Sequence, residues 1–249
     1  MFLQPFKIDR QLSPADIVAK DYRTADVFKK YGIGYCCGGK WPIEMTCEIQ
    51  GISVEKLQQE LEAAVRTVPV SNQLNFPKWC IDFLIDYIIN IHHQYLRQSL
   101  PETMDLLKDF VQEHANKFPW LSELEMKLDL LTQQVFPAMK REEEVLFPYI
   151  RQIAHACKDK EPYAVLLIKT LRKPVEDTIF NGHEALTDTI FSIRAITNQY
   201  NTAPNVCTSH KVVMAKLKEL DNDLMHHLYL EQSILLPKAM SIEKEVLSM

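Results

Sequence analysis

Polar side chains that bind metals stand at positions of this sequence where apolar residues are expected. Along four long segments, apolar residues recur every three or four positions, which is the pattern of helices with one buried face. Five members of these apolar stripes are histidine or glutamate: His93, Glu142, His183, His227 and Glu231. An ionised carboxylate is costly to bury unless it is paired or bound to a metal. No lysine or arginine occupies a stripe position, so a multivalent cation is the simplest partner for both glutamates.

Imidazole together with carboxylate suits iron or manganese better than a structural zinc site, which is usually rich in thiolates. A single core histidine is more often hydrogen-bonded to backbone than to a metal, and a single glutamate could reflect a misplaced helix register. Five such residues on the inward faces of four helices favour a shared metal site over coincidence. Four neighbours lie off the stripes, and we interpret them as solvated or as supports for the ligands: His92, His226, Glu143 and Glu144.

A short internal repeat strengthens the metal hypothesis. Residues 142–148 read E-E-E-V-L-F-P and residues 231–237 read E-Q-S-I-L-L-P, so each copy places a glutamate six residues before a proline. In the second copy His227 precedes Glu231 by four residues, which is one helical turn, so both side chains can reach one metal. The corresponding position in the first copy is Ala138, which cannot bind a metal.

A second candidate for chemistry is the adjacent pair Cys36 and Cys37, in a segment (residues 31–40) that holds 4 of the 6 glycines. The glycines give the backbone freedom around two thiols, and Lys40 supplies a cation that favours thiolate. A redox or thiol role is therefore expected, although two small thiols packed in a tight turn remain an alternative. The spacing does not match a nucleotide-binding loop. We interpret the other cysteines as ordinary apolar residues: Cys47, Cys80, Cys157 and Cys207.

The elements that position these residues are helices. Four long helices are predicted at 78–99, 120–155, 162–200 and 208–240, with a shorter helical piece after Pro101, and they indicate a four-helix bundle. The stripe of the second helix comprises Leu121, Leu124, Leu128, Leu131, Val135, Ala138, Glu142, Val145 and Tyr149.

The N-terminal part is predicted to be a separate small helical domain. Ser13 and Pro14 begin a helix that ends near Gly32, and a second helix begins at Ser53. A linker with prolines and amides, residues 67–77, separates this part from the bundle. We therefore expect two domains, residues 1–70 and 71–249.

Composition excludes several classes of function. The chain has 249 residues, 47% of them hydrophobic, and a net charge of −5 without a polybasic stretch, so neither nucleic acid nor an anionic membrane is an expected partner. The N-terminus lacks a signal-peptide pattern and no apolar run is long enough to span a membrane. Reduced thiols and a cytoplasmic location follow as expectations. The sequence contains no hydrolase or kinase constellation, so whether the protein is an enzyme stays open.

The Tyr35-Cys36-Cys37-Gly38-Gly39-Lys40 segment ahead of such a bundle resembles the iron–sulfur cluster repair di-iron proteins. That family joins a small N-terminal Cys-Cys-Gly-Gly domain to a haemerythrin-like four-helix bundle, so the resemblance implies an all-α fold of this kind. It also implies repair of iron–sulfur clusters damaged by nitric oxide or oxidants. The damaged iron–sulfur proteins are then the clients, and a homodimer is compatible with the sequence.

The resemblance also implies ligand roles. The family's ligands on the first and third helices fall on His93 and His183, and its last-helix pair falls on His227 and Glu231. Its second-helix glutamate falls on Glu142, and the two glutamates are the implied metal bridges. The implied cofactor is non-haem iron, with two ions. The family's remaining histidine falls on Ala138, which leaves the second site one protein ligand short.

Two other functions compete with cluster repair at this point. One is a haemerythrin-like module that binds or senses O₂ or nitric oxide, although such a module has no use for a thiol pair such as Cys36 and Cys37. The other is a regulatory scaffold that has lost its metal together with the ligand at Ala138.

Overall fold

The computed structural model describes residues 7–36, 41–65, 74–159 and 163–248. These residues form helices joined by turns and loops, with no strand among them, so the predicted all-α fold with a helical bundle is confirmed. The chain divides into two compact units. The first comprises Met1–Asn72 and Tyr200–Lys216, and the second comprises Gln73–Gln199 and Leu217–Met249. The grouping of residues 200–216 with the N-terminal part is a feature that the linker at 67–77 does not predict.

The first unit contains four short helices around a small apolar core. They are α1 (Pro14–Lys20), α2 (Thr24–Lys30), α3 (Ile43–Gln50) and α4 (Val54–Ala64). Ser13 caps α1 by accepting the backbone N–H of Asp16 at 3.2 Å, and Ser53 caps α4 by accepting that of Lys56 at 3.3 Å. Both predicted helix starts are therefore confirmed. The fully buried core side chains include Phe28, Ile43, Leu57 and Leu61.

Two details of this unit differ from the prediction. The helix expected from Pro14 to Gly32 is interrupted at Asp21, whose backbone is extended and whose carboxylate accepts the N–H of Arg23 at 3.1 Å. This local bond offers the backbone an alternative to the helix. Helix α3 was not predicted, because it is short and only Ile43 and Cys47 give it a buried face. Gly51, with φ at +68°, ends it.

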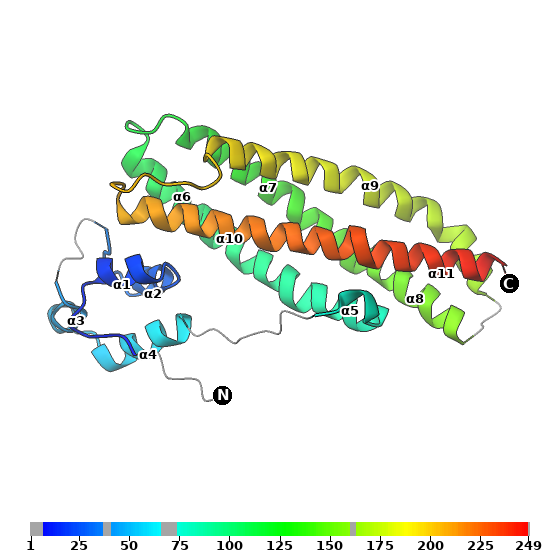
Figure 1. Cartoon of the computed structure of the whole chain (residues 1–249), viewed down its shortest axis with the longest axis horizontal. Coiled ribbons are helices and arrows are strands. Elements are labelled where there is room, and N and C mark those ends of the chain that lie inside the picture. Colours follow the sequence, from blue (N-terminus) through cyan, green and yellow to red (C-terminus); the bar gives the residue numbers. More distant parts are fainter. Residues whose placement is uncertain (1–6, 37–40, 66–73, 160–162, 249) are drawn as a thin grey trace. The chain divides into compact units, whose positions relative to one another are not determined.

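The second unit is a bundle of long helical rods (Figure 1). A 3₁₀ turn, η1 (Phe76–Lys78), precedes the first rod. Three of the rods contain a π-helical segment between two α-helices. These elements are α5 (Ile81–Tyr87), η2 (Ile88–His93) and α6 (Gln94–His114); α7 (Leu121–Arg141), η3 (Glu142–Leu146) and α8 (Phe147–Lys158); and α10 (Thr208–Leu230), η4 (Glu231–Leu235) and α11 (Leu236–Ser248). The fourth rod is the single helix α9 (Ala164–Ile196). Helix α10 begins in the first unit and belongs to the second from Leu217 onward.

The first rod is longer than predicted, because α6 continues through Pro101 to His114 instead of stopping near residue 99. A proline removes one backbone donor and usually bends or breaks a helix. Here Leu100, Met104 and Leu107 are buried on both sides of the proline, so an uninterrupted apolar face holds the helix together. The last rod also extends beyond the predicted end, to Ser248.

The π-helical segment η3 explains why the predicted stripe of the second rod fails at Val145. A π-helical turn holds more residues than an α-helical turn, so it shifts the inward position within that turn. Tyr149 of the predicted stripe, in α8, is buried as expected. Val145, expected inside, is 47% exposed, whereas Leu146 and Phe147 are 3% and 1% exposed. A strict spacing of three and four residues cannot anticipate this shift.

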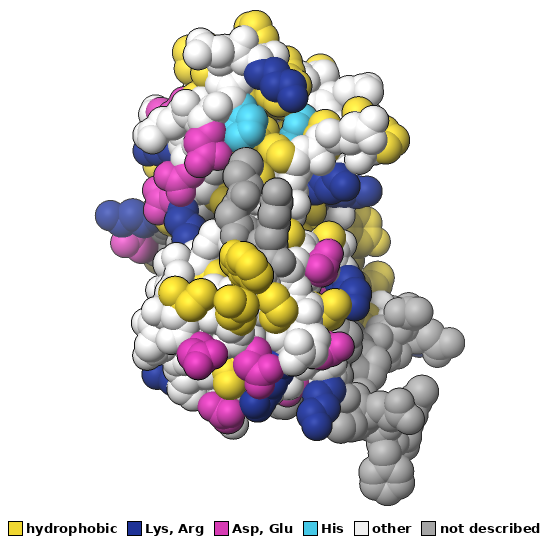
Figure 2. Space-filling view, turned by 90° about the vertical axis from the view of Figure 1, so that its left-hand side faces the viewer, with side chains coloured by type: hydrophobic (Ala, Val, Ile, Leu, Met, Phe, Trp, Pro, Cys, Tyr) yellow, Lys and Arg dark blue, Asp and Glu magenta, His cyan; other side chains and the backbone are white. Residues whose placement is uncertain are grey.

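Figure 2 shows acidic and basic side chains interspersed on one face of the molecule, without a field of a single sign. Among the helices of the described ranges, none has an apolar stretch long enough to cross a membrane.

Candidate metal centre

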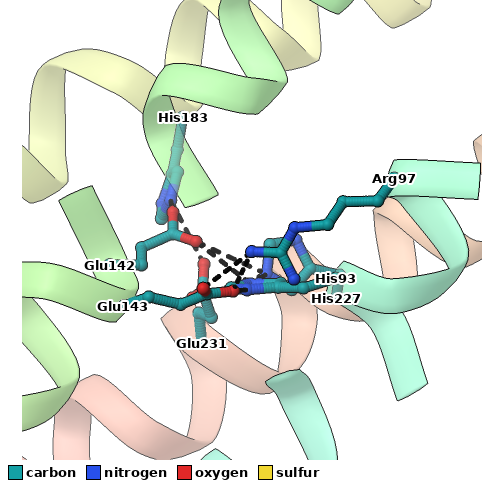
Figure 3. Close-up of polar contacts among 7 residues, drawn as sticks. All are labelled: His93, Arg97, Glu142, Glu143, His183, His227 and Glu231. Atoms are coloured by element: carbon teal, nitrogen blue, oxygen red, sulfur yellow. Dashed lines mark hydrogen bonds and ion pairs between the residues drawn. The ribbon is translucent and has the colours of Figure 1, made fainter. Parts of the chain in front are cut away.

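Four buried side chains from three rods of the second unit converge on one point (Figure 3). They are His93 at the end of η2, Glu142 at the start of η3, His227 in α10 and Glu231 at the start of η4. One ligand atom from each lies within 4.8 Å of all the others. All four residues are at most 4% exposed. Each of the three rods thus delivers one ligand from a π-helical segment, a feature often found at functional sites, and His227 comes from α10 just before such a segment.

The distances between these ligand atoms suit a bound ion. His93 Nε2 lies 3.2 Å from Glu142 Oε2 and 3.1 Å from His227 Nε2, and His227 Nε2 lies 3.5 Å from Glu231 Oε1. Donors placed around a metal at about 2.0–2.2 Å from each are separated by distances of this size. Two imidazole nitrogens that face each other also need either a shared proton or a cation between them.

His183 in α9 approaches the same two carboxylates from the opposite side. Its Nε2 lies 3.2 Å from Glu231 Oε2 and 3.5 Å from Glu142 Oε1. Each glutamate therefore turns one oxygen toward His183 and the other toward the histidine pair, as Figure 3 shows. Each carboxylate therefore offers its two oxygens to histidines on two different sides.

Unsatisfied buried atoms indicate that a cation fits here. Within the described ranges, Glu142 Oε2 and both side-chain oxygens of Glu231 are buried and have no hydrogen bond of acceptable geometry. Such oxygens are expensive to bury, since each has lost its water, and the nearest imidazole nitrogens, at 3.2–3.5 Å, do not replace it with a well-aligned hydrogen bond. An ion coordinated by these oxygens and the facing imidazole nitrogens removes this cost. The donor set of histidine and carboxylate suits iron.

The charge balance of the cluster leads to the same conclusion. Burial by itself lowers the pKa of His183, but the carboxylates of Glu142 and Glu231 outweigh burial and raise it to about 9. Burial also lowers the pKa of His227, and the negative charge of Glu231 more than compensates and raises it. Conversely, burial raises the pKa of Glu231, whereas the charge of His227 and contact with His183 lower it to a greater extent. Protonated imidazoles thus supply the positive charge that a metal ion would supply in their place.

Glu143 and Arg97 support His93, and of these two only Glu143 was predicted as a neighbour of the ligands. His93 Nδ1 lies 2.5 Å from Glu143 Oε1, and Arg97 Nη2 donates to both oxygens of that carboxylate at 2.6 Å. Burial raises the pKa of Glu143, but His93 and Arg97 together lower it. A carboxylate on the second nitrogen of a ligating histidine fixes the ring and its tautomer. The available sequence signal for Arg97 was its position one helical turn after His93.

We expect Glu143→Gln to weaken metal binding by about 10–100-fold, the usual effect of removing such a support. The amide keeps the size of the side chain but loses the charge that orients His93. Metal affinity can be measured by competition with a chelator. Glu144→Gln is the matched control, because Glu144 is the adjacent residue and its side chain is 63% exposed. Equal affinities for the two variants would show that the Glu143 pair is only a surface salt bridge.

His92 was expected to be solvated or to support the ligands, and it is buried at 2% exposure. Its Nδ1 lies 2.9 Å from Asp223 Oδ1, and its ring lies edge-on to His226 with centroids 5.0 Å apart. His92 is not part of the cluster in which the ligand atoms converge. This placement agrees with the prediction that His92 lies beside the ligands and is not one of them.

The side of the centre formed by His183 is the one with fewer protein ligands and with access from outside. One imidazole stands there against two on the other side. Beside His183 opens a cavity of about 440 Å³, lined also by Glu184, Thr187, Asp188, Gln232, Leu236, Pro237 and Met240. Ala138 is buried in α7, the helix that packs along α9, and its carbonyl accepts the backbone N–H of Glu142. The two residues therefore share one face of the helix.

The thiol candidates lie outside this centre. Cys36 belongs to the first unit, in the loop after α2, and is half-buried. Cys37 falls outside the described residues. Of the other cysteines, Cys47 is buried as expected, whereas Cys80 is exposed. Cys207 lies next to Cys36, and this contact was not predicted.

Comparison with known proteins gives matches over both parts of the chain. Residues 12–65 match the family model ScdA_N, described as a domain of unknown function (DUF542). A protein of Enterobacter sp. strain 638 named "Iron-sulfur cluster repair protein YtfE" is 27% identical over 228 residues, which are 92% of this chain and 96% of that protein. Proteins of the same name from Citrobacter koseri and Escherichia coli O8 are 28% identical, over 89% of this chain and 93% of each relative.

Proposed function

We propose that this protein, a relative of the iron–sulfur cluster repair proteins along about nine-tenths of its chain, takes part in the repair of damaged iron–sulfur clusters using iron held in its bundle. The family resemblance predicted from the sequence is confirmed, and it favours repair over the gas-binding alternative. The observation that carries the proposal is the pair of buried glutamates, each of which faces histidine on both sides.

We assign two iron ions to this centre. His93 and His227 would hold one ion, His183 would hold the other, and Glu142 and Glu231 would be shared between them. Non-haem iron held by such ligands would supply open coordination positions for a small molecule such as nitric oxide. The protein residues orient the ligands through Glu143 and Arg97 and exclude water from the histidine pair by burial.

The cavity beside His183 supports access for a small molecule on that side of the centre. Its lining residues come from α9, η4 and α11. The cavity reaches His183, which is itself 6% exposed. A diatomic molecule or a small chelator can approach His183 by this route, whereas His93 at 0% exposure is closed off. Damage by nitric oxide or oxidants is therefore the form of stress that we assign to this protein.

Damaged iron–sulfur proteins are the proposed clients, and the cytoplasm is the proposed location, because reduced thiols persist there. The net charge of −5 and the mixed surface charges do not favour nucleic acid or anionic lipid as a partner. Association of two copies into a homodimer remains part of the proposal and is testable by light scattering.

The thiol pair gives the most direct test of repair. Replacing Cys36 and Cys37 together with serine should leave the metal content unchanged, because no metal ligand named here is a cysteine. The same double variant should restore the activity of a nitric oxide-damaged cluster protein more slowly than the wild type. Metal content is measured by elemental analysis of protein purified without oxygen, and repair by recovery of client activity.

The controls separate repair from its alternatives. Cys47→Ser with Cys157→Ser removes two other thiols and should leave repair unchanged. Unimpaired repair by the Cys36 and Cys37 variant would return both residues to a packing role. A wild-type protein without bound metal, purified under these conditions, would instead support the regulatory scaffold and refute the iron proposal.

A further inference from the structure

Two cysteines far apart in the sequence meet in the first unit. Cys36 lies in the loop after α2, and Cys207 immediately precedes α10; the thiols of the two residues share a hydrogen bond. Both side chains are half-buried, so neither is closed to a small reagent. Both residues belong to the same compact unit, in which residues 200–216 pack with the N-terminal helices.

The surroundings of Cys207 hold this contact in place. Its carbonyl accepts the backbone N–H of Lys211 at 3.3 Å, so Cys207 is the N-cap of α10, and its sulfur accepts the N–H of His210. Further along α10, Lys216 donates to Asp26 of α2 and lies over the ring of Tyr22 at 6.0 Å. The start of α10 is thereby fixed to the segment that leads into Cys36.

We propose that Cys36 and Cys207 are a redox pair that closes to an intramolecular disulfide when the protein meets a peroxide and reopens with a thiol reductant. The proposal goes beyond cluster repair, since it assigns to Cys36 a reversible modification and names Cys207 as the second thiol of the bond. A disulfide needs sulfur atoms about 2.05 Å apart, and the contact between the two thiols means that their side chains already point toward each other.

The chemistry balances with hydrogen peroxide as the oxidant. The Cys36 thiolate attacks one peroxide oxygen, the O–O bond breaks, and the sulfur becomes a sulfenic acid while one water leaves. Cys207 then attacks that sulfur, the S–S bond forms, and the sulfenic hydroxyl leaves as a second water. Two thiols lose two electrons and peroxide gains them. Burial, followed by the neighbouring Cys36, raises the pKa of Cys207, which favours Cys207 as the thiol that attacks second.

The disulfide would have two consequences for the chain. It removes Cys36 from the Cys-Cys-Gly-Gly segment as a reactive thiol. It also ties that segment covalently to the residue just before α10, the helix that carries His227 further along. The pair thus makes the availability of Cys36 depend on peroxide.

The test is a map of disulfides in the full-length protein after treatment with a slight excess of hydrogen peroxide and alkylation of the remaining thiols. Digestion after lysine and arginine releases residues 31–40, which contain Cys36 and Cys37, and residues 195–211, which contain Cys207. We expect these two peptides to be joined, to lose two hydrogens in mass, and to separate after reduction. The exposed thiol of Cys80 is the internal control and should stay outside this link.

Single variants assign the sulfur atoms. Cys37→Ser should keep the link between the two peptides, whereas Cys36→Ser and Cys207→Ser should each abolish it. The readout is a covalent bond, so it does not depend on whether repair is the function of the protein. Loss of the link in Cys37→Ser, a bond between Cys36 and Cys37, or a Cys207 thiol that is fully alkylated after peroxide treatment would each overturn the proposal.

Discussion

Replacing Glu231 with alanine should remove at least one metal ion and lower the affinity for any remaining ion by more than about 100-fold, the upper range for the loss of a mere supporting group. Glu231 is 0% exposed, and its two oxygens face His227 at 3.5 Å and His183 at 3.2 Å. The variant should also lose the stabilisation that bound metal provides. That stabilisation is about 2.7 kcal/mol when free metal is at 100 times the dissociation constant.

Two comparisons make this result specific. The thermal midpoint of each protein is compared with and without added iron, so that each serves as its own metal-free reference. Iron should raise the midpoint of the wild type and change that of Glu231→Ala much less. Glu144→Ala removes an exposed glutamate of the other repeat copy and should behave as the wild type. Full metal content in Glu231→Ala would show that this carboxylate is not a ligand.

The candidate site was predictable because its chemistry conflicts with its surroundings. A glutamate in an apolar stripe is improbable without a partner, and the periodicity of the sequence alone places His227 and Glu231 on one inward face. The structure brings all five stripe residues together. The supports were harder to find, because Arg97 lies on a half-exposed position and its pairing with Glu143 depends on how two rods pack.

Other features lay beyond a single periodicity. The π-helical segments come from tertiary packing, so the inward position moved from Val145 to Leu146 without a sequence signal. The continuation of α6 through Pro101 likewise depends on neighbours that bury both sides of the proline. The contact between Cys36 and Cys207 joins positions separated by most of the chain, and local patterns carry no information about such distances.

Ala138 is the position at which a single substitution should increase the metal content of the centre. It precedes Glu142 by one helical turn, as His227 precedes Glu231, and the bond between the Ala138 carbonyl and the Glu142 N–H keeps that turn helical. Helix α7 packs along α9, which supplies His183, so a histidine at position 138 would add an imidazole on the side that has one rather than two. The cavity beside His183 shows that this side is also the accessible one.

We therefore expect the wild type to hold fewer than two irons per chain, or two of which one is weakly held, and Ala138→His to raise the content toward two. A gained ligand should tighten the weaker ion by at least about 10–100-fold. Elemental analysis and chelator competition measure both effects. Ala138→Leu is the matched control, because it fills similar space without a donor atom, and it should leave the weaker ion as weak as before. If the wild type instead holds two tight irons and Ala138→His changes neither content nor affinity, another group already completes the site. Position 138 would then not face the metal centre, and the two repeat copies would not be equivalent.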